Sequence, residues 1–249
     1  MENSTASVKV AERLGRIPTT IACDILRDED LGDRVVTGLR PVTNLSASIA
    51  GPVRLIEFLP GRPELRRPGP PANFLLIDEL EPGEVLMLCA GGSMKGAVLG
   101  DMLATRAKAC GAQGALVDGA VRDLDGLAES GLPVQARGVA PMAAHATLIP
   151  FDCRHPVCFA GVTVLPDDWV LADRDGALVL TRPLVDLLLD RQATTMARDA
   201  FSQGLIREGF PLRDVFPLPA GLMPFLDDFR QSGAMPDPIA VRRVLSGGT

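Results

Sequence analysis

The order of elements predicted in the middle of the chain constrains the fold more than any other feature. The apolar run "VLMLCA" at 85–90 predicts a buried strand. The glycine-flanked segment from Ser93 to Gly111 contains "GDMLATRAKAC", whose apolar residues recur at helical spacing, and Gly111 is placed to end that helix. The run "GALVDG" at 114–119 then returns to strand. A strand, a helix and a strand in succession are the parts of a parallel crossover unit, so we predict an α/β fold.

Segments on the N-terminal side add two helices and a strand to this unit. In 8–27 apolar residues recur at helical spacing on both sides of Pro18, which predicts two short helices separated by the proline. The run "VRLIEFL" at 53–59 predicts another buried strand. The prolines and glycines of 60–73 predict an irregular surface loop, which is a candidate lid or subunit contact.

Segments on the C-terminal side add more strands and a long helix. The stretches 157–166 and 168–181 are strand-like, and the second contains a hairpin turn from Asp173 to Gly176. Pro183 suits the first turn of a helix that extends through Ile206. We therefore predict a central mixed sheet with flanking helices and a C-terminal helical extension.

The last part of the chain predicts a different organisation. Beyond Gly209 several prolines are separated by only short apolar groups, which we expect to build no core of their own. The chain is accordingly divided into an α/β domain at 1–182 and a region at 183–249. We predict that the helix and proline-rich tail of the second region pack on a neighbouring subunit.

Charge and composition exclude several classes of protein. The 249 residues carry a formal net charge of -6, which argues against a nucleic-acid partner because phosphate recognition needs a concentrated basic surface. Only Lys9, Lys95 and Lys108 are lysines, so most positive charge is arginine, whose planar fork matches a carboxylate. The five cysteines are an odd number without regular spacing, which disfavours a disulfide scaffold. No apolar leader and no run of roughly 18 apolar residues is present, so we expect a cytoplasmic protein without a membrane partner.

An anion site is predicted where the central helix begins. Gly100 and Asp101 stand at the turn that enters the helix, so the first backbone N–H groups, from Asp101 through Met102 to Leu103, have no helical partner and can receive a carboxylate. The alternative is structural, because an aspartate in a first turn is also favoured by the helix dipole.

A cation and an anion stand side by side after the next strand. We expect that strand to end at Val117 and the following loop to deliver Arg122 and Asp123 to the edge where α/β proteins place ligands. Such a pair suits enolate chemistry, because the aspartate can hold Mg²⁺ or Mn²⁺ while the arginine binds the oxygen that becomes negative. On spacing alone, a solvated surface ion pair is the more frequent explanation.

Other candidate sites are weaker. The segment "GGSMKG" lacks the residue order of a phosphate-binding loop, and its glycine-rich surroundings do not desolvate Lys95 as a Schiff-base lysine requires. Cys153, His155 and Cys158 supply three soft ligands, whereas a structural zinc site takes four. His145 stands alone between alanines and is interpreted as a packed or surface residue.

The segment "LGDMLATRAKACGAQGALVDGAVRDLDGL", followed by "VQARGVAP", resembles the family of the regulator of ribonuclease activity A and the 4-hydroxy-4-methyl-2-oxoglutarate aldolases. Weaker similarity extends over roughly residues 10 to 220, through "TTIACDIL", "GPVRLIEF" and "IREGFPLRDVFPLP". The resemblance implies a swivelling β/β/α-type sandwich that assembles as a homotrimer or homohexamer with sites between subunits. It also implies a lyase that uses a divalent metal and a pyruvate enolate to cleave a small 2-oxo acid, including oxaloacetate by decarboxylation.

The resemblance assigns roles to particular residues. Asp123 would ligate the metal, and Arg122 would bind the keto and carboxylate oxygens of the substrate. The helix start at Gly100 to Leu103 would cradle the substrate carboxylate, and Asp101 would hold a metal-bound water that acts as the base. The aldolases also place a glutamate from a neighbouring subunit near these waters. Asp199 stands at that place here, one methylene shorter, so either the water network shifts or Asp199 has no part.

The resemblance leaves two classes of function open. One is the enzyme, and the other is a binding protein like the ribonuclease regulators, which act without chemistry. The C-terminal extension with its extra carboxylate favours the enzyme, because the shorter regulators lack it. A further possibility is the same scaffold acting on a different acid, since the proline-rich segment at 60–73 can reshape the pocket.

Overall fold

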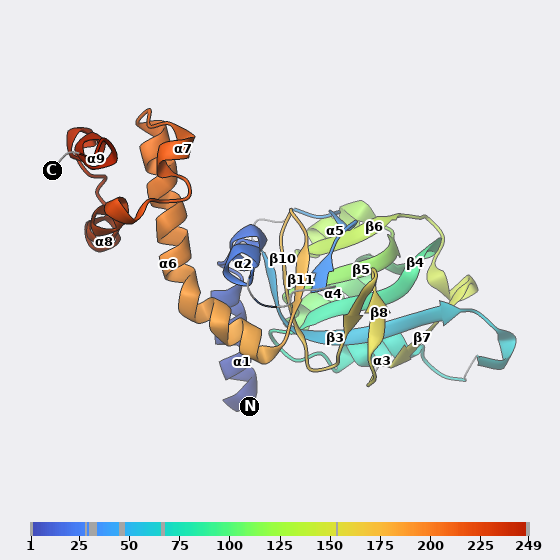
Figure 1. Cartoon of the computed structure of the whole chain (residues 1–249). Helices are drawn as coiled ribbons and strands as arrows, with labels where there is room; N and C mark the ends of the chain where they lie inside the picture. The colour runs from blue at the N-terminus through green and yellow to red at the C-terminus, as the bar shows by residue number, and fades with distance from the viewer. Residues whose placement is uncertain are drawn as a thin grey trace. The chain divides into compact units, whose positions relative to one another are not determined.

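The computed structural model shows two compact units, Met1–Leu189 and Asp190–Thr249 (Figure 1). The residues that the structure describes are 2–27, 29, 34–44, 48–65, 68–152 and 154–247.

The first unit is built on a mixed sheet, as predicted. Among the described residues the sheet has nine strands in the order β1-β11-β10-β3-β4-β5-β6-β2, with β7 paired to β3. The neighbours β3, β4, β5 and β6 are parallel, and the other pairs are antiparallel. The strands are β1 (Val35–Val36), β2 (Arg40–Pro41), β3 (Ile49–Pro60), β4 (Val85–Leu99), β5 (Gly114–Val121), β6 (Val134–Val139), β7 (Leu148–Asp152), β10 (Trp169–Ala172) and β11 (Ala177–Leu180).

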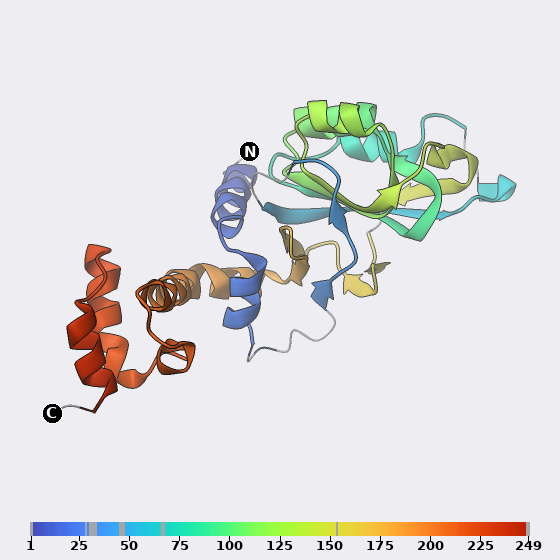
Figure 2. The same ribbon diagram turned by 90° about the horizontal axis from the view of Figure 1, so that it is seen from above.

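Helices cover the parallel part of the sheet. The helices α3 (Ala72–Asp78), α4 (Asp101–Ala109) and α5 (Leu124–Glu129) share one core with side chains of β3 to β6, and Figure 2 shows them together on one side of the sheet. The helix α4 connects the parallel strands β4 and β5, which confirms the predicted crossover unit. It buries Ala104 and Ala107, and it ends before Gly111, whose φ of 90° is in the left-handed region that favours glycine. None of the described helices combines the length and the hydropathy that a bilayer crossing requires.

Other elements complete the first unit. The helices α1 (Glu2–Leu14) and α2 (Thr19–Ile25) lie on either side of Pro18, as predicted, and share a core with β10, β11 and the start of the long helix α6. The strand-like stretch at 157–166 forms a hairpin of β8 (Val157–Phe159) and β9 (Val162–Val164), which packs on side chains of β4 and β5. The predicted turn between β10 and β11 is also present, where the Asp173 N–H donates to the Gly176 carbonyl.

Two predicted boundaries are wrong, and both strands are longer than expected. The strand β4 continues to Leu99, so the helix begins at Asp101 and the segment from Ser93 is extended. The strand shifts register between Cys89 and Leu99, which lets this glycine-rich part remain paired with β5. The strand β5 likewise continues beyond Val117 to Val121, because Gly119 and Ala120 are small enough to stay buried in the sheet.

The C-terminal unit corrects a further prediction. The long helix α6 (Arg182–Arg207) has the predicted extent, and its last turns pack with α7 (Leu212–Val215), α8 (Met223–Ser232) and α9 (Pro238–Leu245). These elements bury a core of their own, contrary to expectation: Phe201, Leu205, Phe210, Val215, Leu222, Leu226 and Val241. The prolines do not prevent it, because Pro224 and Pro238 stand in the first turns of their helices, where a missing N–H breaks no hydrogen bond.

Candidate functional site

A pocket of about 490 Å³ lies beside the ends of β4 and β5. All five residues predicted to bind substrate line it, namely Gly100, Asp101, Met102, Leu103 and Arg122. The other lining residues come from elsewhere in the first unit: Phe58, Pro71, Asn73, Phe74, Ala97, Val98, Ala143, Ala144, His145, Leu148 and Pro150.

Strand pairing brings the two halves of the motif together. The last residues of β4 and β5, Leu99 and Val121, are register partners, and the Arg122 N–H donates to the Leu99 carbonyl at 3.0 Å. Because parallel strands end at the same edge of a sheet, Gly100 and Arg122 emerge next to each other despite their separation in sequence.

Gly100 permits close approach between these two segments. A Cβ atom at this position would lie 2.8 Å from Asp123 Oδ2 and 3.2 Å from Arg122 Nε. The backbone of Gly100 is extended, so its φ does not require glycine. The requirement is the space that the Asp123 carboxylate and the Arg122 side chain occupy.

Arg122 and Asp123 form an ion pair at the edge of the pocket. Arg122 Nε lies 3.1 Å from Asp123 Oδ2, and each side chain is 41% exposed. Asp123 has φ 57° and ψ 51°, a left-handed conformation that is uncommon for residues other than glycine, and its carbonyl accepts the Leu127 N–H at the start of α5. Conformations of this kind concentrate at functional sites, where the surrounding structure maintains them.

Asp101 engages part of the predicted anion site. Its Oδ1 accepts the Met102 N–H at 2.7 Å, so one of the N–H groups at the helix start already has a carboxylate partner. A Cβ atom at Gly126 would lie 2.6 Å from Asp101 Cβ, so α5 approaches Asp101 closely. A substrate carboxylate bound here would share or replace the contact between Asp101 and Met102.

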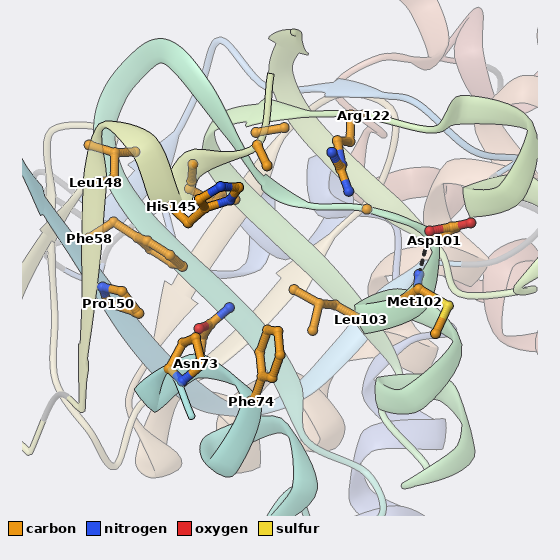
Figure 3. Close-up of a pocket in the computed structure, with 16 residues that line it drawn as sticks. Phe58, Asn73, Phe74, Asp101, Met102, Leu103, Arg122, His145, Leu148 and Pro150 are labelled. Carbon is orange, nitrogen blue, oxygen red and sulfur yellow. Dashed lines mark hydrogen bonds between the residues drawn. The ribbon is translucent and has the colours of Figure 1, made fainter. Parts of the chain in front are cut away.

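The pocket has a charged end and an apolar end. Figure 3 shows Arg122 and Asp101 at one end, and Phe58, Leu148 and Pro150 at the other. The residues of the apolar end come from β3, α3 and β7, which are far apart in the sequence and carry no spacing signal. Sequence reasoning therefore missed them.

Asn73 and His145 are the polar side chains nearest this apolar end (Figure 3). Asn73 is buried, whereas His145 is exposed. The exposure of His145 agrees with its interpretation as a packed or surface residue. The structure also places Pro71 and Asn73, at the end of the predicted loop 60–73, in the lining of the pocket.

Asp118 and Arg137 form a second polar centre that sequence reasoning did not identify. Asp118 is buried in β5, where it accepts the Arg137 Nε–H and, at 3.0 Å, the Ala160 N–H. These contacts join β5, β6 and the turn between β8 and β9. Both residues line a pocket of about 950 Å³. The available signal was a single aspartate within the otherwise apolar strand "GALVDGAV".

The remaining candidates are not among the residues that line the first pocket, or they fall outside the described residues. Asp199 is a partly buried residue of α6 within the C-terminal unit. Cys153 lies outside the described residues, Cys158 is exposed, and His155 Nε2 lies 3.6 Å from Glu57 Oε2. The described part of the chain contains no cluster of three or more metal-ligating His, Cys, Asp or Glu side chains.

Comparison with known proteins gives consistent similarities. The model of the RraA-like family, described as Aldolase/RraA, matches residues 19–179. A candidate 4-hydroxy-4-methyl-2-oxoglutarate aldolase of Stutzerimonas stutzeri is 41% identical over 115 residues, covering 45% of this chain and 70% of that protein. One of the same name from Azotobacter vinelandii is 40% identical over the same shares of both chains.

A solved structure extends the similarity over more of the chain. Streptomyces coelicolor RraAS2, described as an unusual member of the RNase ES inhibitor RraA protein family, matches with a TM-score of 0.70 and 30% identity. The match covers 78% of this chain and 96% of that protein.

Proposed function

The chain belongs to the RraA-like family of aldolase/RraA proteins, and we propose that it is a lyase that cleaves a carbon–carbon bond of a small 2-oxo acid with the help of Mg²⁺ or Mn²⁺. One observation carries the proposal. Arg122 and the start of α4 line one end of a single pocket, and the Asp123 carboxylate lies next to both Arg122 and Gly100. The names of the curated relatives support an aldolase.

Arg122 is suited to bind the 2-oxo acid group. Its Nε is held by Asp123, which orients the guanidinium and leaves its two terminal nitrogens as donors. A guanidinium can donate to a keto oxygen and a carboxylate oxygen together, because its donors lie in one plane. The same donors would stabilise the negative charge that develops on the keto oxygen during cleavage.

The donor set at this end fits a divalent ion of the Mg²⁺ type. Mg²⁺ in proteins is held by one or two carboxylates and keeps several waters or substrate oxygens. Asp123 supplies one exposed carboxylate, and its Oδ2 lies close to the backbone of Gly100 because glycine has no side chain there. When bound there, the ion would act as a Lewis acid on the keto oxygen.

Cleavage then requires one proton to leave and one to be added. The hydroxyl on C4 loses its proton and the C3–C4 bond breaks. C4 becomes a carbonyl carbon, and the electron pair of the broken bond remains on C3 of the pyruvate fragment. Asp101, in the first turn of α4, lines the pocket and would position the water that takes this proton. Protonation at C3 releases pyruvate, and loss of CO₂ from oxaloacetate generates the same fragment.

A regulator that binds a ribonuclease is the second candidate. The observation in its favour is the match to RraAS2, which belongs to a family described as RNase ES inhibitors. A regulator of this kind would need no turnover, so an assay of catalysis separates the two candidates.

The direct test is pyruvate release from oxaloacetate and from 4-hydroxy-4-methyl-2-oxoglutarate. It is measured with Mg²⁺, with Mn²⁺ and with a chelator, and corrected for decarboxylation by metal alone. We expect release that the chelator abolishes. The absence of release from both acids with either metal would overturn the enzyme and leave the regulator.

A further inference from the structure

The end of the pocket remote from Arg122 is built for an apolar group. Phe58 and Leu148 are each 5% exposed, and both turn a side chain toward the pocket from neighbouring strands. Phe74 on α3 and Pro150 on β7 add to this wall (Figure 3). A pyruvate unit held by Arg122 would fill only a small part of the volume of about 490 Å³. The rest of the pocket has room for the remainder of a larger ligand.

Charge is confined to the opposite end. Of the sixteen described residues that line the pocket, Asp101 is the acidic one and Arg122 the basic one, and both belong to the charged end. The polar groups at the apolar end are the neutral amide of Asn73 and the imidazole of His145. Among the described residues, no lysine or arginine lines that end of the pocket, where a second carboxylate would lie.

We propose that the substrate is a 4-hydroxy-2-oxo acid whose C4 carries an uncharged apolar group, aromatic or branched aliphatic, in place of a second carboxylate. This inference rests on the proposed function for the 2-oxo acid end. Cleavage would release pyruvate and an apolar aldehyde or ketone. The bonds that break and form are those of the retro-aldol step, and no oxidant or reductant is needed.

The preference follows from desolvation. A carboxylate placed among Phe58, Leu148 and Pro150 would lose water and gain no guanidinium or ammonium partner from the described residues of the lining. An aromatic ring in the same place removes apolar surface from water on both sides of the contact. The amide of Asn73 can satisfy one neutral oxygen but cannot compensate a charge.

Binding of two matched acids that cannot be cleaved tests the inference directly. Calorimetry with Mg²⁺ present compares 2-oxo-4-phenylbutanoate with 2-oxoglutarate, which share the 2-oxo acid group and differ in an apolar or charged end. We expect the phenyl compound to bind about tenfold tighter or better, given the area that a buried ring removes from water. Equal or tighter binding of 2-oxoglutarate would overturn the inference.

Two variants locate the preference in the pocket. Phe74→Arg places a cation at the apolar end, and we expect it to reduce or reverse the preference for the phenyl compound. Leu75→Arg is the matched control, because Leu75 is 50% exposed, close to the 47% of Phe74 on the same helix, and it does not line the pocket. The same loss of preference in both variants would contradict a role for the pocket wall.

Turnover separates failure of this inference from failure of the proposed function. Oxaloacetate has no carbon beyond C4, so its decarboxylation tests the charged end without an apolar substituent. Release of pyruvate from oxaloacetate together with a preference for 2-oxoglutarate would overturn the apolar substrate and keep the lyase. Preferred binding of the phenyl compound without pyruvate release from either oxaloacetate or 4-hydroxy-2-oxo-4-phenylbutanoate would support the apolar ligand and overturn the lyase.

Discussion

At the scale of single residues, the pocket depends on a glycine that admits two charged side chains. Gly100 has no side chain, and a Cβ atom added there would lie only 2.8 Å from Asp123 Oδ2. Asp123 in turn holds Arg122, and its own backbone is left-handed. The positions of these three residues are therefore coupled, and a change at one of them is expected to move the others.

Gly100→Ala tests this coupling. The added methyl group should displace the Asp123 carboxylate, and we expect pyruvate release to fall at least about tenfold while the fold is retained, because small misplacements of reacting groups cost large factors in rate. Thr105→Ala, an exposed change on the same helix, is the control. Full activity of Gly100→Ala would show that the contact is not needed.

Arg122→Lys tests the guanidinium. Lysine keeps the charge but not the planar pair of donors, so we expect kcat/KM for oxaloacetate to fall by roughly 10²–10³, the range found when a donor to a developing negative charge is removed. Arg106→Lys is a matched control, because Arg106 lies on α4, pairs with Asp78 and does not line the pocket. An unchanged rate for Arg122→Lys would remove Arg122 from the mechanism.

Asp168 predicts a pH dependence of stability. Burial raises the pKa of this carboxyl, against the lowering effects of the Leu165 N–H and Arg34, and Asp167 raises it further. Because the folded pKa is above the unfolded one, the folded state binds the proton more tightly. The contribution of Asp168 to stability therefore increases as the pH falls through its folded pKa, and it is unfavourable at neutral pH.

Asp168→Asn should remove this contribution while the side-chain oxygen still accepts the Leu165 N–H. Urea unfolding at several pH values should give the variant a higher free energy of unfolding than the wild type near neutral pH. This difference should disappear as the pH falls below the folded pKa of Asp168. Asp167→Asn, an exposed neighbour, should show a smaller change. A constant difference between wild type and Asp168→Asn at all pH values would refute the assignment.

At the scale of elements, the turn between β8 and β9 is joined to the sheet through a buried charge. Asp118 on β5 accepts from Arg137 on β6 and from the Ala160 N–H in the turn. A buried carboxylate with fewer partners would be costly, so these contacts explain how a charge is accommodated in an apolar strand.

Asp118→Ala should destabilise the first unit by about 3 kcal/mol, because it removes the partner of a partly buried guanidinium and frees the hairpin turn. The measurement is the free energy of unfolding in urea. Asp125→Ala, at an exposed position of α5, is the control. A midpoint unchanged by Asp118→Ala would mean that the hairpin is held by its apolar contacts alone.

At the scale of the whole molecule, each unit has its own apolar core. The resemblance to aldolases implies a homotrimer or homohexamer in which Asp199 of one subunit serves the pocket of another. We propose this arrangement for the present chain.

Light scattering should then give three or six times the mass of one chain. A mixture of Arg122→Lys and Asp199→Ala proteins, refolded together, should recover part of the activity that each lacks alone. In a mixed oligomer, some pockets would combine the intact Arg122 of one subunit with the intact Asp199 of another. A monomer, or a fully active Asp199→Ala protein, would contradict the shared site.

Local sequence patterns were sufficient for much of this protein. Helical spacing and glycine positions in 85–121 predicted the crossover unit, because backbone preferences and apolar periodicity act within a few residues. The adjacent Arg122 and Asp123 and the helix start at Gly100 were also visible, since each is a local motif. The lengths of β4 and β5 were not, because the last residues of both strands, which include glycines, are held by pairing with neighbouring strands.

Only the tertiary structure decided what surrounds these motifs. The apolar end of the pocket joins β3, α3 and β7, and the Asp118 centre joins β5, β6 and a hairpin turn. The C-terminal core forms between helices whose prolines stand at their first turns. In each case the determining contacts are between residues distant in sequence. Periodicity specifies which face of an element is buried, but not which other elements pack against that face.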